Sequence, residues 1–419
     1  MSNNDKTDGA AIAARALEHI RHLSVTIGPR GSTTEGERRG AEYAAGVMGK
    51  WTKNVETQPF RCYSTYSYPW ALIAVLMAAS GLALWVSPPA ALILAGLNLP
   101  LYFAVSSGRA DVGFLFPKRP SQNVWGRVPA RGAGRRVVLM AHVDTTRAAL
   151  VFAPKALKNL RASHILNMVS AVAVFVLSLA VFGLENVWGI GGAGEVARQG
   201  GGPATYLLPG LRIVASIFAL ISIYALFTLA HRQLVMPYVA GANDNASGVG
   251  LTLAIGEHYA ANPLPNTEIW CVVTGAEESG YPAGARKFVD AHLPELRESE
   301  VLVLDNIGAG DLRHLTKEGI TLPLRMDQGL LNLARRLGSC HPEWSVRDSV
   351  CNLGYTDATP VIAAGCRAIV LWAEGADGFL RNYHWPTDTF ENVDPETVGR
   401  AATFITEMIQ AIDQGKDRG

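Results

Sequence analysis

Four long apolar stretches, arranged as two pairs, are the feature that most constrains how this chain can fold. The first pair lies within residues 67–106, on either side of a Ser-Pro-Pro turn, and the second pair lies within residues 164–230. Nearly uncharged stretches that approach the roughly 20 residues needed for a helix to cross a bilayer are typical of transmembrane segments. We therefore predict two transmembrane hairpins, 67–106 and 164–230, with four spans in all.

A buried helical hairpin in a large core would have a similar composition, so the membrane interpretation needs support from other features. Tyr68, Trp70 and Tyr102 stand near the ends of the first pair, where interfacial aromatic residues of membrane proteins are enriched. Only 17% of the residues are charged, and the mean hydropathy of +0.15 is high for a soluble enzyme. The second apolar pair in the same chain also favours spans over core helices.

The basic residues around the hairpins predict their orientation. The two loops at the far ends of the hairpins carry only Arg198, whereas basic residues are frequent in the flanks next to the rest of the chain. By the positive-inside rule, the bulk of the protein lies in the cytoplasm. The basic flanking residues are Arg61, Arg109, Lys118, Arg119, Arg147, Lys155, Lys158, Arg161 and Arg232.

Other features agree with an integral protein of the plasma or inner membrane whose main domain is cytoplasmic. Residues 1–8 are polar and lack the basic and apolar regions of a secretory signal. The five Cys have no CxxC spacing, which indicates reduced thiols rather than a disulfide framework. The net charge of +1 gives no electrostatic reason to expect a nucleic-acid partner.

Outside the hairpins, apolar patterns of strand and helix length alternate along residues 1–66, 107–163 and 231–419. Such alternation predicts an α/β fold, a mostly parallel mixed sheet with helices on both faces, around the inserted four-helix transmembrane region. Short connections among the first three expected strands favour an antiparallel meander. The expected strands are 55–60 (at a sheet edge), 122–128, 136–141, 268–274, 301–304 and 368–372, and the expected helices are 10–23, 34–51, 247–259 and 395–410.

Several of these segments end in carboxylates or imidazoles. The buried-strand pattern 137–141 is followed by His142 and Asp144, and ligands of open α/β sheets bind beyond such strand ends. Two His with several carboxylates and no Cys suit Zn²⁺, and a carboxylate shared by two ions suits a two-metal hydrolytic site. The other candidate residues are Asp244 in the loop 241–248, Glu277 and Glu278 after strand 268–274, Asp305 after strand 301–304, and Tyr383 with His384 in a later loop.

Each of these residues taken alone also fits an ordinary structural role. Asp244 fits a helix cap, Asp305 fits a turn at a strand end, and His384 fits a hydrogen-bond donor in a loop. Because carboxylates and imidazoles recur at successive strand ends, their joint occurrence favours a metal site over separate structural roles.

The ordered motifs resemble metallopeptidase family twenty-eight, the co-catalytic zinc exopeptidases that include aminopeptidases S and Y and glutamate carboxypeptidase. The resemblance covers most of the chain outside 67–106 and roughly 147–236. It also includes the N-terminal motif 27–32. The motifs that carry it are Ala141-His-Val-Asp-Thr145, Gly241-Ala-Asn-Asp-Asn-Ala-Ser-Gly248, Gly275-Ala-Glu-Glu-Ser279, Leu304-Asp305, Tyr355-Thr-Asp-Ala-Thr-Pro360 and Tyr383-His384 with Asp388-Thr389.

The resemblance implies a zinc-binding site with two ions per chain. Asp244 would bridge the ions, Glu278 and His384 would complete one of them, and His142 and Asp305 would complete the other. Glu277 would be the general base for a water molecule activated by the metals. Three further implied features are an orienting role of Asp144 toward His142, a contact of Tyr383 with the carbonyl oxyanion, and a cis peptide bond between Asp244 and Asn245.

The function that this resemblance implies is that of a membrane-anchored aminopeptidase, a hydrolase that acts on peptide substrates at the lipid bilayer. One alternative is a glutaminyl-cyclase-like acyltransferase, but those enzymes use one zinc ion and alter the loop around the bridging Asp, which Asp244-Asn245-Ala246 keeps. Another is a catalytically inactive receptor or scaffold, but such relatives lose ligands that are all present here. The chain departs from the family where a hairpin separates His142 from Asp244, and at Ala358, where relatives often carry a bulkier residue.

Overall fold

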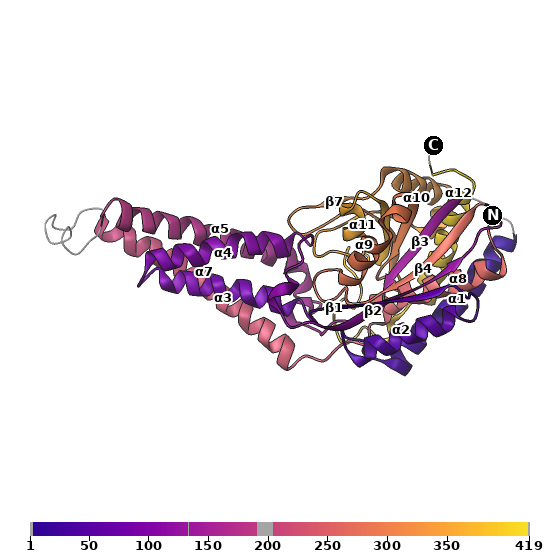
Figure 1. Cartoon of the computed structure of the whole chain (residues 1–419), viewed down its shortest axis with the longest axis horizontal. Helices are drawn as coiled ribbons and strands as arrows, with labels where there is room; N and C mark the ends of the chain where they lie inside the picture. Colours follow the sequence, from indigo (N-terminus) through magenta and orange to yellow (C-terminus); the bar gives the residue numbers. More distant parts are fainter. Residues whose placement is uncertain (1–2, 133, 191–203, 418–419) are drawn as a thin grey trace. The chain divides into compact units, whose positions relative to one another are not determined.

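The computed structural model describes residues 3–132, 134–190 and 204–417, and these form two compact units. The first, the sheet unit, comprises Met1–Tyr66, Gly113–Lys158 and Met236–Gly419. The second, the helical unit, comprises Ser67–Val112 and Asn159–Val235. The predicted hairpins 67–106 and 164–230 fall inside the helical unit, and the candidate site residues fall inside the sheet unit. Figure 1 shows the elements of both units.

The sheet unit is built on a nine-stranded mixed sheet in the order β1-β2-β4-β3-β5-β9-β6-β7, with β8 paired to β6. Its centre is parallel, because β4, β3, β5 and β9 run in one direction. β1 pairs antiparallel with β2, β2 with β4, and β6 with β9 and β7, whereas β8 pairs parallel with β6. The strands are β1 Val55–Cys62, β2 Arg119–Val128, β3 Arg135–His142, β4 Thr267–Thr274, β5 Ser299–Leu304, β6 Asp311–Glu318, β7 Leu324–Arg325, β8 Arg347–Cys351 and β9 Arg367–Glu374.

The predicted α/β class is therefore confirmed, as is the position of β1 at the edge of the sheet. The predicted meander is correct for β1 and β2, which pair antiparallel, but wrong for β3. β4 lies between β2 and β3, so that β3 has parallel partners on both sides. This arrangement buries the apolar run of β3 on both faces, which an antiparallel edge ribbon would not do.

Helices cover both faces of the sheet. Trp270 of β4 packs against Phe288 and His292 of α9, while the next residue, Cys271, lies against Gly256 of α8. Since consecutive strand residues point to opposite faces, α8 and α9 lie on opposite sides of the sheet. The helices of this unit are α1 Asn3–Arg21, α2 Glu35–Met48, α8 Ser247–Ala261, α9 Ala283–Arg297, α10 Gln328–Cys340, α11 Ala358–Ala363 and α12 Pro395–Asp413.

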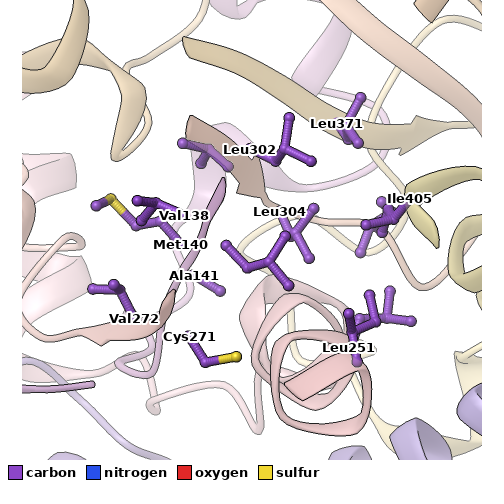
Figure 2. Close-up of a cluster of buried hydrophobic side chains, with 14 of the residues drawn as sticks. Val138, Met140, Ala141, Leu251, Cys271, Val272, Leu302, Leu304, Leu371 and Ile405 are labelled. Atoms are coloured by element: carbon purple, nitrogen blue, oxygen red, sulfur yellow. The ribbon is translucent and has the colours of Figure 1, made fainter. Parts of the chain in front are cut away.

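The core between sheet and helices is apolar and closely packed. Every residue from Val137 to Ala141 has no exposed surface, in keeping with the continuous apolar run of β3. Figure 2 shows part of this cluster, in which Ala141, Leu304 and Leu371 from neighbouring strands gather with Leu251 of α8 and Ile405 of α12. This packing fixes the carboxyl ends of the central strands relative to one another.

Among its described residues, the helical unit has four apolar helices at the places of the four predicted spans. These are α3 Ser67–Ala83, α4 Pro88–Ser106, α5 Leu160–Phe182, which a further turn extends to Val187, and α7 Ala204–Leu234. Three helical stretches among the described residues, Pro88–Ser106, Leu157–Val187 and Tyr206–Leu234, are long and apolar enough to cross a membrane, whereas α3 has 17 residues. The Gly-rich patch at 190–202 lies outside the described residues apart from Ile190.

Candidate metal centre

The central strands bring the predicted site residues together at their carboxyl ends. His142 is the last residue of β3, Glu277 and Glu278 follow β4, and Asp305 follows β5 directly. Asp244 lies in the turn Ala242–Ala246 that leads into α8. His384 lies in the loop after β9. Parallel neighbouring strands end at the same edge of a sheet, so residues far apart in the sequence meet there.

Two groups of three buried side chains form the centre and share Asp244. In the first group, Nε2 of His142 lies 3.4 Å from Oδ1 of Asp244 and 3.6 Å from Oδ1 of Asp305. In the second, Nε2 of His384 lies 3.1 Å from Oδ2 of Asp244 and 2.9 Å from Oε1 of Glu278. A carboxylate that offers one oxygen to each of two groups is the arrangement of a bridging metal ligand.

The donors in these groups fit divalent zinc. Oδ2 of Asp244 is buried and has no hydrogen-bond partner among the described residues, although His384 lies near it. A buried carboxylate oxygen without a hydrogen bond is costly, and a cation would satisfy it. Each group offers one imidazole and two carboxylates, with no thiolate among them, and this mixture is a common zinc ligand set.

The electrostatics of the centre also favour cations. Burial raises the pKa of Glu277 well above its usual value and raises that of Glu278. Burial alone would lower the pKa of His384, but the nearby carboxylates of Glu278 and Asp244 raise it to about 9. In His142, the opposing effect of Asp144, Asp244 and Asp305 likewise outweighs burial and raises the pKa well above its usual value. Divalent cations held among these buried groups would supply charge that compensates the carboxylates.

Asp144 contacts both His142 and the turn that carries the two Glu residues. Its backbone carbonyl lies 3.1 Å from Nδ1 of His142, a contact in which Nδ1–H donates and Nε2 keeps its lone pair. Its carboxylate accepts hydrogen bonds from the backbone N–H groups of Glu277, at 3.1 Å, and Glu278, at 3.0 Å, and from the hydroxyl of Ser32, at 2.6 Å. The backbone carbonyl of Asp144 thus contacts His142 directly, one carboxylate oxygen lies 3.7 Å from the same Nδ1, and the carboxylate also holds the Glu277–Glu278 turn.

Glu37 supports the same turn from the other side, and sequence reasoning assigned it no role. Its carboxylate is buried and accepts hydrogen bonds from the backbone N–H of Ala276, at 2.7 Å, from the Ser121 hydroxyl, at 2.9 Å, and from the Thr33 backbone N–H. Ala276 has φ 54, in the left-handed region that residues with a side chain seldom adopt. Glu37 therefore stabilises the uncommon backbone conformation that directs the two following Glu residues.

The buried side chains of Asp388 and Arg30 hold the loop that carries Asp244. The carboxylate of Asp388 accepts hydrogen bonds from the backbone N–H groups of Asn243, at 2.7 Å, and Asp244, at 3.1 Å. The fully buried Arg30 donates to the backbone carbonyl of Gly241 at 2.8 Å. The peptide bond between Asp244 and Asn245 is cis, as the resemblance predicts. The roles of Arg30 and Asp388 were not predicted, although both residues lie in motifs singled out in the sequence.

Tyr383 stacks on His384, with ring centroids 3.9 Å apart and an interplanar angle of 24°. Burial raises the pKa of Tyr383 well above its usual value, so its hydroxyl stays protonated at neutral pH and can donate a hydrogen bond. The ring of Phe152, in the connector between β3 and α5, meets both Tyr383 and His384. The contact of Tyr383 with a carbonyl oxyanion stays a prediction.

Asp357 is a buried carboxyl group beside the metal centre, and no role for it was predicted from the sequence. Asp357 accepts a hydrogen bond from the hydroxyl of Thr274 at 2.6 Å, and burial raises its pKa to about 7. Its other oxygen is buried without a hydrogen-bond partner among the described residues. Asp357 lies in the motif Tyr355–Pro360, so the sequence marked its position without indicating this environment.

A family model matches part of the chain. The model of peptidase family M28 matches residues 226–409, a stretch that includes Asp244, Glu277, Glu278, Asp305 and His384 but not His142. The chain has no match among curated proteins.

Solved structures show the same fold at low sequence identity. A zinc aminopeptidase from Bacillus subtilis aligns with 15% identity and a TM-score of 0.55 over 96% of this chain and 95% of its own. A glutaminyl cyclase from Tannerella forsythia aligns with 17% identity and a TM-score of 0.54 over 95% of this chain and 97% of its own. A Zn-dependent exopeptidase from Parabacteroides distasonis aligns with 16% identity and a TM-score of 0.53 over 95% of this chain and 97% of its own. The mixed α/β sheet is thus the fold of these enzymes.

Proposed function

We propose that this protein is a membrane-anchored zinc exopeptidase, an aminopeptidase that removes N-terminal residues from peptides. The observation that carries the proposal is the buried Asp244, shared between a group with His142 and Asp305 and a group with Glu278 and His384. The match to peptidase family M28 and the aminopeptidases among the similar structures support the same chemistry.

Two zinc ions would be held by these five residues, with Asp244 as the bridge. Zinc bound there supplies positive charge that polarises a peptide carbonyl and makes water easier to deprotonate. The residues of this chain then provide the acid–base chemistry and the orientation of the peptide.

Glu277 is the proposed general base. Its Oε2 lies 4.0 Å from Nε2 of His142, beside the centre but outside both groups of ligands. In peptide hydrolysis the water oxygen forms a bond to the carbonyl carbon, and the carbon–nitrogen bond breaks. Glu277 takes the proton from water and delivers it to the leaving amine, while the Tyr383 hydroxyl donates to the carbonyl oxygen as negative charge develops there.

Glutaminyl cyclisation is a second candidate, because a glutaminyl cyclase is among the similar structures. That reaction is an intramolecular acyl transfer and consumes no water, so the products distinguish it from hydrolysis. The presence of both complete groups, including that of His142, Asp244 and Asp305, favours the two-metal peptidase.

The membrane anchor is proposed from the helical unit. Its apolar side chains remain largely exposed on the helices, among them Ile217, Leu220 and Phe227, at 52%, 64% and 63%. Exposed apolar surface of this extent is costly in water and suits contact with lipid. The basic residues that flank the helices support a cytoplasmic sheet unit by the positive-inside rule.

The test uses the full chain purified in detergent. Metal content is measured by mass spectrometry, and activity is measured with aminoacyl fluorogenic substrates and with an N-terminal glutaminyl peptide. Two equivalents of zinc and release of the N-terminal residue support the proposal. Undiminished hydrolysis by a chelated, metal-free preparation contradicts it, and conversion of the glutaminyl peptide without uptake of water supports the cyclase instead.

A further inference from the structure

The two imidazoles of the metal centre are oriented in different ways. Nδ1 of His142 has a backbone partner in Asp144, 3.1 Å away. Nδ1 of His384 is buried and has no hydrogen-bond partner among the described residues. A metal-binding His ordinarily donates its second ring N–H to a carbonyl or carboxylate, which fixes the ring. Another contact must therefore fix the ring of His384.

The backbone of His384 makes this need greater. Its φ is 49, in the left-handed region that residues with a side chain seldom adopt. Such a conformation persists only where the surrounding structure over-determines it. The contacts around the ring are therefore expected to hold both the side chain and its backbone.

Two aromatic rings provide these contacts. The Tyr383 ring stacks on the His384 ring at 3.9 Å. The ring of Phe152 meets the His384 ring nearly perpendicular, with centroids 4.6 Å apart and an interplanar angle of 80°. Phe152 also meets Tyr383 edge to face, at 5.3 Å and 84°. Perpendicular aromatic contacts at this spacing are directional, so together the two rings restrict how the imidazole can rotate.

Phe152 is itself held in place by its own segment. It ends the short helical turn Leu150–Phe152, in the connector that leads from β3 to α5. The start of this connector pairs with the chain that returns from α7, because Ala148 N–H donates to Pro237 at 2.9 Å and Val239 N–H donates to Thr146 at 3.0 Å. Phe152 is 9% exposed, so the ring is buried where it meets His384.

We propose that Phe152 is a positioning residue for the metal ligand His384, and that its ring replaces the hydrogen bond that usually orients a metal-binding imidazole. The inference rests on the proposed function, because it takes His384 to be a zinc ligand. It makes the zinc site of the sheet unit dependent on a residue of the connector into the second pair of apolar helices, a segment outside the residues that match the family model.

The experiment is a zinc titration of the metal-free full chain in detergent, against a competing chromogenic chelator. Phe152→Ala and Phe152→Leu, which remove the ring, should weaken the zinc step that depends on His384 by roughly 10-fold or more, as loss of an orienting partner typically does. Phe152→Tyr, which keeps the ring, should stay within about threefold of the wild type. Phe116→Leu is the matched control, because it removes an aromatic ring that meets Tyr63 edge to face in the same unit.

A double-mutant cycle distinguishes a specific effect of Phe152 on His384 from a loss of zinc affinity caused by general loss of structure. In a His384→Ala background, Phe152→Ala should leave the remaining zinc affinity unchanged, whereas general damage to the fold would lower it again. Thermal unfolding of the metal-free variants identifies any that fail to fold. If Phe152→Ala does not fold, the zinc affinities of Phe152→Leu and Phe152→Tyr are compared instead.

The outcomes separate this inference from the proposed function. If the wild type takes up no zinc, the proposed function fails and the inference fails with it. If the wild type binds zinc and the Ala and Leu variants bind it equally well, the positioning role is overturned while the proposed function stands. Equal losses in the Leu and Tyr variants also overturn it, since the ring would then not be the feature that matters.

Discussion

The carboxylate of Asp144 accepts a hydrogen bond from the backbone N–H of Glu278 at 3.0 Å, so the end of β3 is tied to the turn after β4. The neighbouring N–H of Glu277 donates to the same carboxylate. One buried side chain, 0% exposed, therefore sets the position of both a proposed zinc ligand and the proposed general base. This dependence explains why a residue that lies in neither ligand group should matter to the reaction.

We expect Asp144→Ala to lower zinc affinity and turnover together, each on the order of 10–100-fold, because the turn carrying Glu277 and Glu278 loses its anchor. Zinc affinity is measured by chelator competition and turnover with an aminoacyl fluorogenic substrate. Ser32→Ala is the control, since it removes one hydroxyl donor to Asp144 and leaves both backbone hydrogen bonds intact. Wild-type values for Asp144→Ala would contradict the anchoring role.

The adjacent residues Glu277 and Glu278 are expected to respond differently to the same substitution. Glu277→Gln should keep both zinc ions and reduce kcat by roughly 10²–10⁴-fold, because it removes the proton acceptor outside the ligand groups. Glu278→Gln should reduce zinc content, because its carboxylate belongs to the group with His384. Metal analysis and steady-state kinetics on the two variants provide the comparison, and loss of zinc from Glu277→Gln would show that Glu277 is a ligand.

The site residues that can be predicted from the sequence are the imidazoles and carboxylates that stand at the ends of apolar strand patterns. His142 and Asp305 stand directly at the ends of apolar runs, and β3 and β5 place them there. Buried supporting groups are harder to recognise, because a sequence does not show whether a polar residue faces water. Glu37 sits in a helix whose other acidic residues Glu35 and Glu42 are exposed, and only the tertiary fold reveals that it reaches Ala276.

The difference between apolar and polar segments also explains why β6 and β8 were not predicted from the sequence. β3, β5 and β9 are buried on both faces and read as continuous apolar runs. β6 and β8 carry polar and charged residues such as His314 and Asp348, which bond to each other between the strands at 2.7 Å. A strand whose polar groups are satisfied by a neighbouring strand has no apolar pattern of its own, so only the pairing identifies it. The order β2-β4-β3 was likewise beyond prediction, because short connections favour but do not enforce adjacent pairing.

The four apolar helices give a prediction about topology. Reporter domains fused after Gly419 and inserted within residues 190–202 should lie on opposite sides of the membrane, with the C-terminal reporter in the cytoplasm. A third reporter in the turn at 87–89 should agree with the one within 190–202, which would show that α3 spans despite its 17 residues. If the reporters at Gly419 and within 190–202 lie on the same side, the second hairpin does not cross.

The raised pKa of His384, about 9, gives a prediction about pH. The value lies above the ordinary 6.5, so the proton stabilises the metal-free fold below pH 6.5, and this contribution is lost as the pH rises through 9. Zinc binds the deprotonated imidazole, so it must displace that proton at neutral pH. Between pH 7 and 9, zinc affinity should therefore rise by up to about tenfold per pH unit for each proton displaced, while the metal-free protein loses the stability that the proton contributed.

Titration calorimetry in buffers of different ionisation enthalpy measures the protons released when zinc binds. At pH 7.5 we expect release of at least one proton, because His142 also has a raised pKa and lies in the other ligand group. In His384→Ala the release should fall, since the proton held by Glu278 and Asp244 has no imidazole to occupy. Zinc binding that releases no protons at pH 7.5 would show that both imidazoles are neutral in the metal-free protein, and that the carboxylates around them do not retain protons in place of the cations.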